Sequence, residues 1–403
     1  MRMTELIQRE PFGELLVESL KRFLDKEYLC SEILWDENNG NISEFKSSGY
    51  QIWYVNYYTN AIFTACCKKH ILKPLINEFS KSTKWWKSIF QKLYVFASFS
   101  KTFSGTLKHA VIAIRPQLKD WQHILIIPGN HKVRVLDFNS NLCHSVMKKG
   151  YSTDKFSEEI QIRKKMEQHG LSIPAILKTD LNKMIITEEI IIGTPLNRLP
   201  AKKQHACLLQ SLEMITLMLQ ATKKEISIKK YLKQLRGQIQ TALSSSTWND
   251  SSVIQDVKYL AGFLFELVNP ETDYSIMFAQ SHGDFQPANI LCQNDRIWLI
   301  DWEYSAERQY GFDHLVYHLQ SRAPHNLSKR LIKPLSRLQS HRSEDIFGKQ
   351  LSEELYEKRI QLFLLEELLI RLHENIFPYH TTIDKGFHIF INELKSYLVH
   401  FKN

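Results

Sequence analysis

Apolar residues recur at helical spacing near the beginning of the chain. Four of them would share one face of a helix with a period of about 3.6 residues: Leu15, Leu16, Leu20 and Phe23. An Asn-Asn-Gly-Asn turn is predicted at residues 38–41, and aromatic residues are dense at residues 50–58. We expect residues 1–108 to form an N-terminal extension of unknown role.

From about residue 110 the pattern changes to short apolar runs that are typical of β-strands. Four such runs cover residues 110–114, 124–127, 133–136 and 142–148. Gly129 and Asn130, between the second and third runs, indicate a hairpin turn. A helix is predicted next over residues 153–169, and another strand over residues 183–187.

Beyond residue 200 the apolar positions return to helical spacing, at residues 208–219 and again at residues 362–372. A short β-hairpin lies between these helices, with strands at residues 289–292 and 297–300 and a turn at Asn294 and Asp295. The pattern predicts an α+β chain. A small β-rich lobe, residues 109–192, precedes a larger helical lobe, residues 193–403.

The composition is that of an ordinary globular protein, with 43% hydrophobic and 24% charged residues in 403. It excludes disorder, collagen-like repeats and coiled coil as the main architecture. The six cysteines form no CxxC pair, which favours a reduced, intracellular chain over a disulfide framework. Neither a signal-peptide pattern nor a run of about 18 uncharged apolar residues occurs, so we expect a cytoplasmic protein without a transmembrane segment.

The net charge of +9 is concentrated in one part of the sequence. Residues 68–108 contain nine lysines and one acidic residue, Glu78. Such a stretch can be a solvated face, or it can bind an anionic surface, and nucleic acid is the least favoured partner. Trp85 and Trp86 begin a run of aromatic, aliphatic and lysine residues that suits a peripheral helix on an anionic membrane or a helix docked on the next domain.

Several catalytic motifs are missing from the sequence. The fourteen glycines provide no GxG, no GxxxxGK[ST] and no GxSxG pattern, which excludes a Rossmann fingerprint, a Walker loop and a hydrolase nucleophile elbow. His314 and His318 share a helical face without an HExxH pattern, and we interpret them as helical residues rather than as a metal site.

The strongest chemical signal is Ser-His-Gly-Asp-Phe-Gln-Pro-Ala-Asn-Ile-Leu at residues 281–291, followed by Ile-Asp-Trp-Glu at residues 300–303. Asn289 begins one strand of the predicted hairpin and Asp301 ends the other, so the hairpin brings an amide and a carboxylate oxygen together. Mg²⁺ prefers oxygen ligands of this kind when it binds phosphates. Asp284, five residues before Asn289, can then accept the proton of a hydroxyl group.

This order of residues resembles the catalytic and metal-binding loops of the protein-kinase-like fold. The motifs HGDFQPANIL and IDWE resemble those of the aminoglycoside phosphotransferase and choline kinase family of small-molecule kinases. Protein kinases carry HRD and DFG motifs instead. The resemblance covers about residues 110–320 by motif. It implies a two-lobed fold that uses ATP and Mg²⁺, with Asp284 as catalytic base, His282 orienting the loop, and Asn289 and Asp301 as metal ligands.

The resemblance also implies nucleotide-binding roles further upstream. The hairpin turn of Gly129 and Asn130 corresponds to the loop that covers the phosphates. A lysine at the end of the third strand should hold them, and Lys148 fits that position better than the neighbouring Lys149, because it shares a face of the strand with Val146.

The carboxylate partner of that lysine is expected on the following helix, where Glu159 fits better than Glu158. Residues 188–193 look like the hinge between the lobes, with backbone groups of Glu189 and Ile191 hydrogen-bonding the adenine. Asp313, in a Gly-Phe-Asp segment, resembles an aspartate that braces the catalytic loop.

The leading hypothesis is an ATP- and Mg²⁺-dependent kinase for the hydroxyl of a small molecule: an aminoglycoside, an amino alcohol, a sugar or a glycan-type acceptor. Glu366, Glu367 and Glu374 would suit a cationic acceptor or would belong to a solvated helix face. The alternatives are a non-catalytic nucleotide-binding module docked on an anionic partner or membrane, and a protein kinase.

Overall fold

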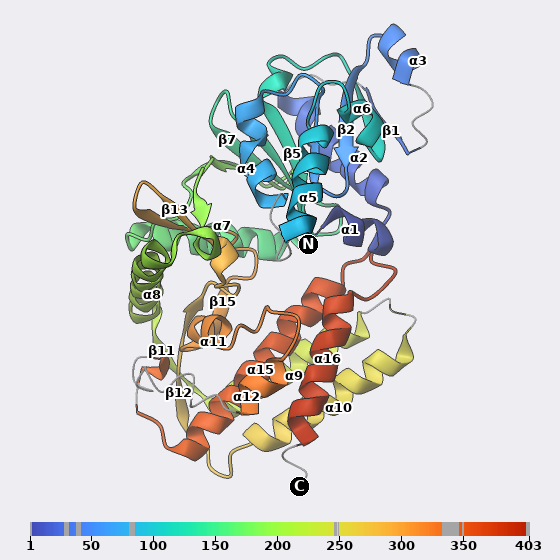
Figure 1. Ribbon diagram of the computed structural model, residues 1–403. Helices are drawn as coiled ribbons and strands as arrows, with labels where there is room; N and C mark the ends of the chain where they lie inside the picture. Colours follow the sequence, from blue (N-terminus) through green and yellow to red (C-terminus); the bar gives the residue numbers. More distant parts are fainter. Residues whose placement is uncertain are drawn as a thin grey trace. The chain divides into compact units, whose positions relative to one another are not determined.

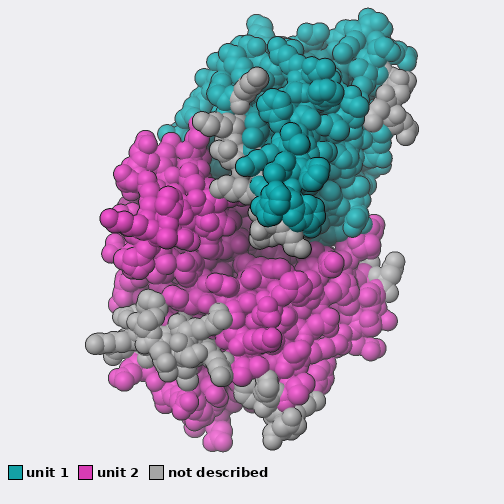
Figure 2. Space-filling view, in the orientation of Figure 1, with its two compact units in different colours: residues 1–153, 175–190 teal, residues 154–174, 191–403 magenta. Residues whose placement is uncertain are grey.

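The computed structural model describes residues 2–27, 32–37, 42–79, 85–245, 248, 250–332, 346–348 and 350–399. The chain divides into two compact units, shown in different colours in Figure 2. Unit 1 comprises residues 1–153 and 175–190, and unit 2 comprises residues 154–174 and 191–403. The turn predicted at residues 38–41 lies outside the described residues.

Unit 1 is built on a nine-stranded sheet in the order β1-β4-β2-β3-β5-β6-β7-β9-β8, with antiparallel neighbours (Figure 1). Its strands are β1 (Glu32–Asp36), β2 (Gln51–Asn56), β3 (Ala61–Phe63), β4 (Ala110–Arg115), β5 (Ile124–Pro128), β6 (Lys132–Asp137), β7 (Leu142–Met147), β8 (Ile176–Asp180) and β9 (Ile185–Glu189). The four strands predicted between residues 110 and 148 are confirmed as β4 to β7.

The N-terminal extension belongs to this same sheet. Its strands β1 and β2 flank β4, and β3 pairs with β5. Its helices are α1 (Met3–Arg9), α2 (Phe12–Glu27), α3 (Ile42–Ser47), α4 (Lys69–Phe79), α5 (Trp85–Ser98) and α6 (Ser104–Leu107). Leu16, Leu20 and Phe23 of α2 share a buried cluster with Val133 and Val146 of the sheet. The boundary expected at residue 108 therefore does not divide the structure, because the residues on both sides of it bury one core.

Unit 2 is largely helical, with two three-stranded sheets, β10-β13-β14 and β11-β12-β15. Its helices are α7 (Thr153–Gln168), α8 (Ala201–Thr222), α9 (Ile228–Ser244), α10 (Ser251–Val268), α11 (Phe312–His318), α12 (Leu327–Ile332), α15 (Glu353–Asn375) and α16 (Lys385–Leu398). Its strands are β10 (Thr194–Pro195), β11 (Lys224–Ser227), β12 (Ser275–Ser281), β13 (Ile290–Gln293), β14 (Arg296–Leu299) and β15 (Ala306–Gln309).

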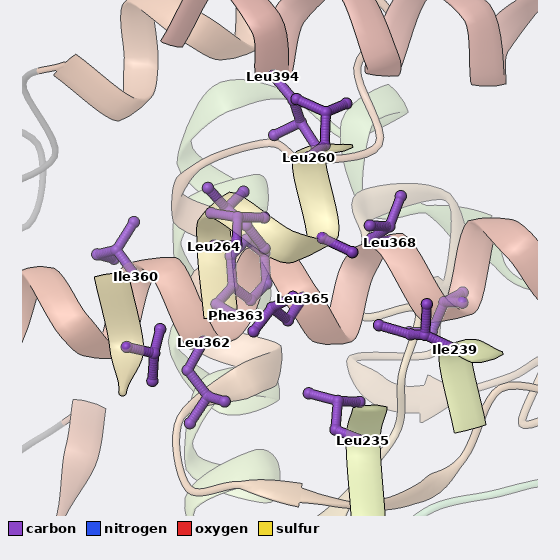
Figure 3. Packing of buried hydrophobic residues seen from close by; sticks show 14 of the residues in the cluster. Leu235, Ile239, Leu260, Leu264, Ile360, Leu362, Phe363, Leu365, Leu368 and Leu394 are labelled. Carbon is purple, nitrogen blue, oxygen red and sulfur yellow. The ribbon is translucent and has the colours of Figure 1, made fainter. Parts of the chain in front are cut away.

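The main core of unit 2 surrounds α15, which packs against both α9 and α10. Figure 3 shows Leu235 and Ile239 of α9, Leu260 and Leu264 of α10, and Leu365 of α15 in this cluster. The helical spacing of apolar residues at 362–372 is thus confirmed as a buried helix.

The predicted hairpin between the helices is confirmed as β13 and β14. Its turn residues Asn294 and Asp295 have φ values of 50° and 63°, a conformation that Asn and Asp tolerate better than most residues. A sheet-based unit 1 and a helical unit 2 confirm the α+β prediction. Within the part of the chain that is described, no helix is both long and apolar enough to span a bilayer.

Candidate active site

The loop after β12 has a conformation that only glycine can provide at its second residue. Gly283 has φ +85°, and a Cβ atom there would lie 2.0 Å from the carbonyl oxygen of Tyr304. This backbone path places His282 and Asp284 on either side of the glycine. The loop therefore lies close against the segment that follows Asp301.

Asp313 binds the backbone of this loop, as we expected from its place in the Gly-Phe-Asp segment. The carboxylate accepts hydrogen bonds from the backbone N–H of His282 at 2.7 Å and of Gly283 at 2.9 Å. Burial raises the pKa of Asp313, while His282 and the two N–H donors oppose that rise. Asp313 is 0% exposed, so the brace is an interior feature of unit 2.

The imidazole of His282 connects the loop to the strand that precedes Asp301. The backbone N–H of Asp284 donates to Nδ1 at 3.3 Å, so the proton of the neutral ring lies on Nε2. Nε2 then donates to the carbonyl oxygen of Ile300 at 3.0 Å. Both ring nitrogens are occupied by backbone groups, which favours the orienting role expected for His282 over proton transfer.

Asp284 is held by three side chains. Its Oδ2 accepts from Asn289 Nδ2 at 2.7 Å, and both carboxylate oxygens accept from Gln286 Nε2, at 2.9 and 3.0 Å. Arg322 Nε lies 3.1 Å from Asp284 Oδ1. The carboxylate is only 14% exposed, so its orientation is defined by these neighbours.

The backbone connects the two segments that carry the expected metal ligands: the N–H of Ile300, the residue before Asp301, donates to the carbonyl oxygen of Asn289 at 3.0 Å. Asn289 uses its amide nitrogen for the side chain and the backbone carbonyl of Asp284, which leaves the amide oxygen to bind a cation. Asp301 adopts φ +69°, a strained conformation for a residue other than glycine, and such strain is common at functional sites. An amide oxygen and a carboxylate fit Mg²⁺, which takes few protein ligands and completes its shell with phosphates and water. Within the described residues, no cluster of three or more His, Cys, Asp or Glu residues could form an all-protein metal cage.

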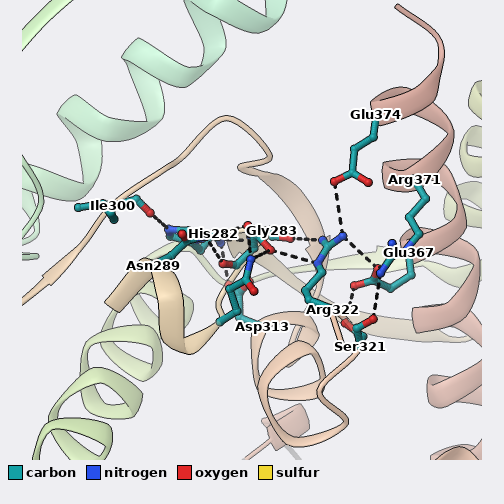
Figure 4. A network of polar contacts seen from close by, with 12 residues as sticks. His282, Gly283, Asn289, Ile300, Asp313, Ser321, Arg322, Glu367, Arg371 and Glu374 are labelled. Carbon is teal, nitrogen blue, oxygen red and sulfur yellow. Dashed lines mark hydrogen bonds and ion pairs between the residues drawn. The ribbon is translucent and has the colours of Figure 1, made fainter. Parts of the chain in front are cut away.

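Arg322 is a residue that the sequence did not single out, and it links Asp284 to two acids of α15 (Figure 4). Its Nη1 lies 3.4 Å from Glu367 and 3.8 Å from Glu374. Burial alone would lower the pKa of Arg322, but the carboxylates of Glu367, Asp284 and Glu374 raise it above its usual value. Arg322 therefore stays charged beside the catalytic loop. No sequence motif surrounds it, so only its position in space reveals it.

A cavity of about 180 Å³ lies within unit 2 beside the segment that follows Asp301. Its lining contains five glutamates and few cationic side chains: Glu158, Glu159, Glu303, Glu307 and Glu366, with Lys155, Arg308 and His373. Burial lowers the pKa of Lys155 to about 8 and that of His373 to about 3, and burial raises the pKa of Glu366 to about 7. Glu366 is buried here rather than placed on a solvated helix face.

Glu159, expected as the partner of the phosphate-binding lysine, has a neighbour of its own within unit 2. Its Oε1 lies 3.6 Å from Arg163 Nη1, one helical turn further along α7, and both side chains are buried. Arg163 also donates to the carbonyl oxygen of Pro174. The role of Glu159 toward a nucleotide stays a prediction.

Unit 1 carries the expected phosphate-binding residues. Lys148 directly follows β7 and is buried, whereas Lys149 is exposed. The Nζ of Lys148 donates to the carboxylate of Glu10, a residue that the sequence did not single out. In the confirmed β5–β6 hairpin, the N–H of Gly129 donates to the carbonyl oxygen of Lys132 at 2.8 Å. This amide closes the turn, so it is already hydrogen-bonded within the protein.

The expected hinge coincides with the boundary between the units, which falls between residues 190 and 191. The N–H of Glu189 donates to the carbonyl oxygen of Ala175, and the N–H of Ile190 donates to that of Asn141. The expected adenine contact with the backbone around Glu189 and Ile191 would therefore use groups other than these two N–H groups. The contact itself stays a prediction.

Comparison with known proteins matches the part of the chain that contains the motif at residues 281–303. The choline/ethanolamine kinase family model matches residues 154–342, somewhat less than half of the chain. This segment contains His282, Asp284, Asn289 and Asp301. None of the curated proteins matches the chain.

Among solved structures, a choline/ethanolamine kinase family protein from Mesorhizobium loti is 16% identical, with a TM-score of 0.41, over 70% of this chain and 88% of its own. Choline kinase from Cryptosporidium parvum is 17% identical, with a TM-score of 0.42, over 70% and 94% of the two chains. A thermostable mutant of aminoglycoside phosphotransferase APH(4)-Ia, in a ternary complex with AMP-PNP and hygromycin B, is 15% identical, with a TM-score of 0.45, over 69% and 93%. The family match confirms, over residues 154–342, the resemblance to the choline kinase group that the motif at residues 281–303 indicates.

Proposed function

We propose that the protein is a phosphotransferase that uses ATP and Mg²⁺ to phosphorylate a hydroxyl group of a small molecule. The observation that carries the proposal is the arrangement around Asp284. Asn289 Nδ2 holds its carboxylate at 2.7 Å, and His282 joins its loop to the residue before Asp301. Hydrogen bonds thus link the proposed base to one proposed metal ligand, Asn289, and to the strand end that carries the other, Asp301.

Each residue has a distinct role in this proposal. Asp284 positions the acceptor hydroxyl and accepts its proton. Asn289 and Asp301 hold Mg²⁺, which when bound offsets the negative charge of the phosphates. Lys148 binds the phosphates, and the backbone of Glu189 and Ile191 binds the adenine.

The cavity beside the metal-binding loop favours a cationic acceptor. Even without Glu366, whose pKa burial raises to about 7, the other four glutamates of the lining outnumber its one lysine and one arginine. Amino alcohols and aminoglycosides carry both an ammonium group and a hydroxyl group. Choline, the substrate in the name of one similar structure, is a cationic alcohol of this class.

The test is MgATP turnover on a panel of amino alcohols, aminoglycosides, sugars and amino acids, with Asp284→Asn as the critical variant. Loss of a general base costs about 10²–10⁴-fold in rate, while the affinity for MgATP should be retained. The matched control is Asp295→Asn, the same substitution in the exposed turn between β13 and β14.

Undiminished turnover in Asp284→Asn would show that the proposed base is wrong. MgATP binding without turnover on any acceptor would favour the non-catalytic nucleotide-binding module. Incorporation of labelled phosphate into protein substrates would favour a protein kinase instead.

We also propose that α5 binds the surface of an anionic bilayer. The helix exposes six large apolar side chains, with relative exposures from 46% to 77%: Trp85, Trp86, Ile89, Phe90, Leu93 and Phe96. At helical spacing these residues form one continuous stripe, while the buried Val95 and Ser98 lie on the opposite side. Exposed apolar area of this extent on one helix marks an interaction surface.

The charges on α5 favour lipid over a protein partner. Lys87 and Lys92 are exposed and lie on the two edges of the apolar stripe, and α5 contains no Asp or Glu. Basic residues that flank an aromatic and aliphatic face are typical of helices that lie in the interface of an anionic membrane.

Sedimentation with vesicles tests this surface. We expect binding to vesicles of phosphatidylserine and phosphatidylcholine, and little binding to pure phosphatidylcholine. Replacing both Lys87 and Lys92 with Glu should weaken binding about tenfold or more, since each basic residue contributes about 1 kcal/mol near the surface. Lys258→Glu, an exposed charge reversal on α10, is the control. Equal binding by the α5 variant and the control would contradict the proposal.

A further inference from the structure

Lys148 has a defined position within unit 1. Its backbone N–H donates to the carbonyl oxygen of His131 at 2.8 Å, and its own carbonyl accepts from the N–H of Tyr151 at 3.2 Å. The side chain is 1% exposed. A lysine that is buried so completely needs a compensating partner, because an isolated ammonium in the protein interior loses its proton.

Glu10 provides this partner from the N-terminal extension. It directly follows α1, and its N–H donates to the carbonyl oxygen of Leu6 at 3.0 Å. Its carbonyl accepts from the N–H of Phe12, the first residue of α2, at 2.7 Å. Leu6 and Phe12 lie in the core of the sheet, so the backbone on both sides of Glu10 is anchored.

The two side chains meet in the interior of unit 1. The Nζ of Lys148 donates to Oε1 of Glu10, and the two side chains are 1% and 0% exposed. Breaking one half of such a buried pair is strongly unfavourable, because the remaining charge has no compensation. The pair therefore keeps the ammonium group of Lys148 in one place.

A second contact ties the extension to the same strand end. Arg22 of α2 donates to the carbonyl oxygen of Met147, the residue before Lys148, and to that of Lys183 at 3.0 Å. Lys183 in turn donates to the carbonyl oxygen of Arg22 at 3.2 Å. The segment from α1 to α2 is thus fixed to the backbone around Lys148 as well as to its side chain.

We infer that Glu10 is a positioning residue for nucleotide binding, supplying in this chain the carboxylate that the family pattern places on the helix after the third strand. The inference rests on the proposed function, in which Lys148 binds phosphates. An ammonium group has three N–H donors, so a fixed contact with Glu10 restricts the directions in which the group can donate to a phosphate. Glu159, the residue at the family position, is paired with Arg163 within unit 2.

The experiment compares the binding of MgATP and adenosine to Glu10→Gln by isothermal titration calorimetry. Only ATP carries the phosphates that Lys148 holds. We therefore expect the affinity for MgATP to fall about ten- to hundredfold, the value of a charge-assisted hydrogen bond, with adenosine binding unchanged. The matched control is Glu14→Gln, an exposed glutamate of α2.

A double variant guards against a folding defect. Glu10→Gln leaves Lys148 without its carboxylate, whereas Glu10→Gln with Lys148→Met leaves neither charge, and it should recover the melting temperature. In the Lys148→Met background, the Glu10 substitution should cause no further loss of MgATP affinity, because its effect passes through the lysine.

The outcomes separate the inference from the proposed function. A wild-type protein that binds no MgATP would refute the function. A wild-type protein that binds MgATP, with Glu10→Gln binding it equally well, would overturn the inference alone. A Glu10→Gln variant that loses adenosine and MgATP to the same degree would also overturn it, since that result indicates a general structural effect.

Discussion

The conformation of the loop that carries Asp284 requires glycine at position 283. Its φ of +85° and the carbonyl oxygen of Tyr304 at 2.0 Å from an added Cβ leave no room for a side chain. We expect Gly283→Ala to lower the free energy of unfolding by about 3 kcal/mol, from the left-handed backbone and the overpacking together. Turnover should fall as well, because Asp284 moves with the loop. Denaturant unfolding and kinetics measure both effects.

Gly170 is the control for this substitution. It has a similar φ of +80°, but a Cβ there would meet nothing within 4 Å. Gly170→Ala should therefore cost only about 1–2 kcal/mol and leave turnover intact. Equal losses in the two variants would mean that the contact with Tyr304 has no separate effect.

Glu366 makes the stability of the protein depend on pH. Burial raises its pKa from 4.5 to about 7, against hydrogen bonds from Tyr231 and Gln309 that oppose the rise. Between these values the folded chain holds a proton that the unfolded chain has released. The contribution of Glu366 to the free energy of unfolding is therefore fully present below about pH 4.5, and it is lost as the pH rises through about 7.

We expect Glu366→Gln to reduce this pH dependence, because a neutral amide does not titrate. The difference in unfolding free energy between about pH 5 and about pH 8 should shrink by up to about 3 kcal/mol. Glu353→Gln, at an exposed position of the same helix, should retain the wild-type dependence. An identical pH profile for Glu366→Gln and the wild type would contradict the assignment.

At the scale of elements, local patterns predicted the strands and hairpins well. β5, β6 and β7 begin and end within two residues of the predicted runs, because short apolar runs between turn residues carry their own signal. The order of the sheet could not be predicted this way. β4 lies between β1 and β2, and that placement depends on pairings between strands far apart in the sequence.

Helix α15 shows a similar limit. The spacing of its leucines predicts a helix, yet Glu366 and Glu367, left open as a solvated face, are 2% and 0% exposed. Tyr231 and Gln309 bind the first acid, and Ser321, with Arg322 and Arg371, surrounds the second. A buried acid and a solvated acid look alike in a helical repeat, because the difference lies in partners from other elements.

At the scale of the whole molecule, the N-terminal extension is required for unit 1. Removing residues 1–108 would leave β4 without β1 and β2, would leave β5 without β3, and would expose the core that α2 covers. We expect a chain that begins at residue 109 to aggregate, with no cooperative melting of unit 1 and no MgATP binding. A soluble truncated chain that melts cooperatively and binds MgATP like the full protein would show that the extension is dispensable.

The sequence by itself predicted strands β4 to β7, the β13–β14 hairpin and the motif that carries the candidate catalytic residues. Asp284, Asn289 and Asp301 lie within eighteen residues of one another, so a short hairpin was enough to expect them in one loop system, and the structure joins Asn289 to Asp284. The tertiary structure alone decided which distant residues pair with the candidate site residues within each unit. Glu10 reaches Lys148 across 138 residues, and Arg322 joins Asp284 to α15. Local spacing encodes neighbours within a turn or a hairpin, whereas these contacts exist only after the core has brought separate elements together.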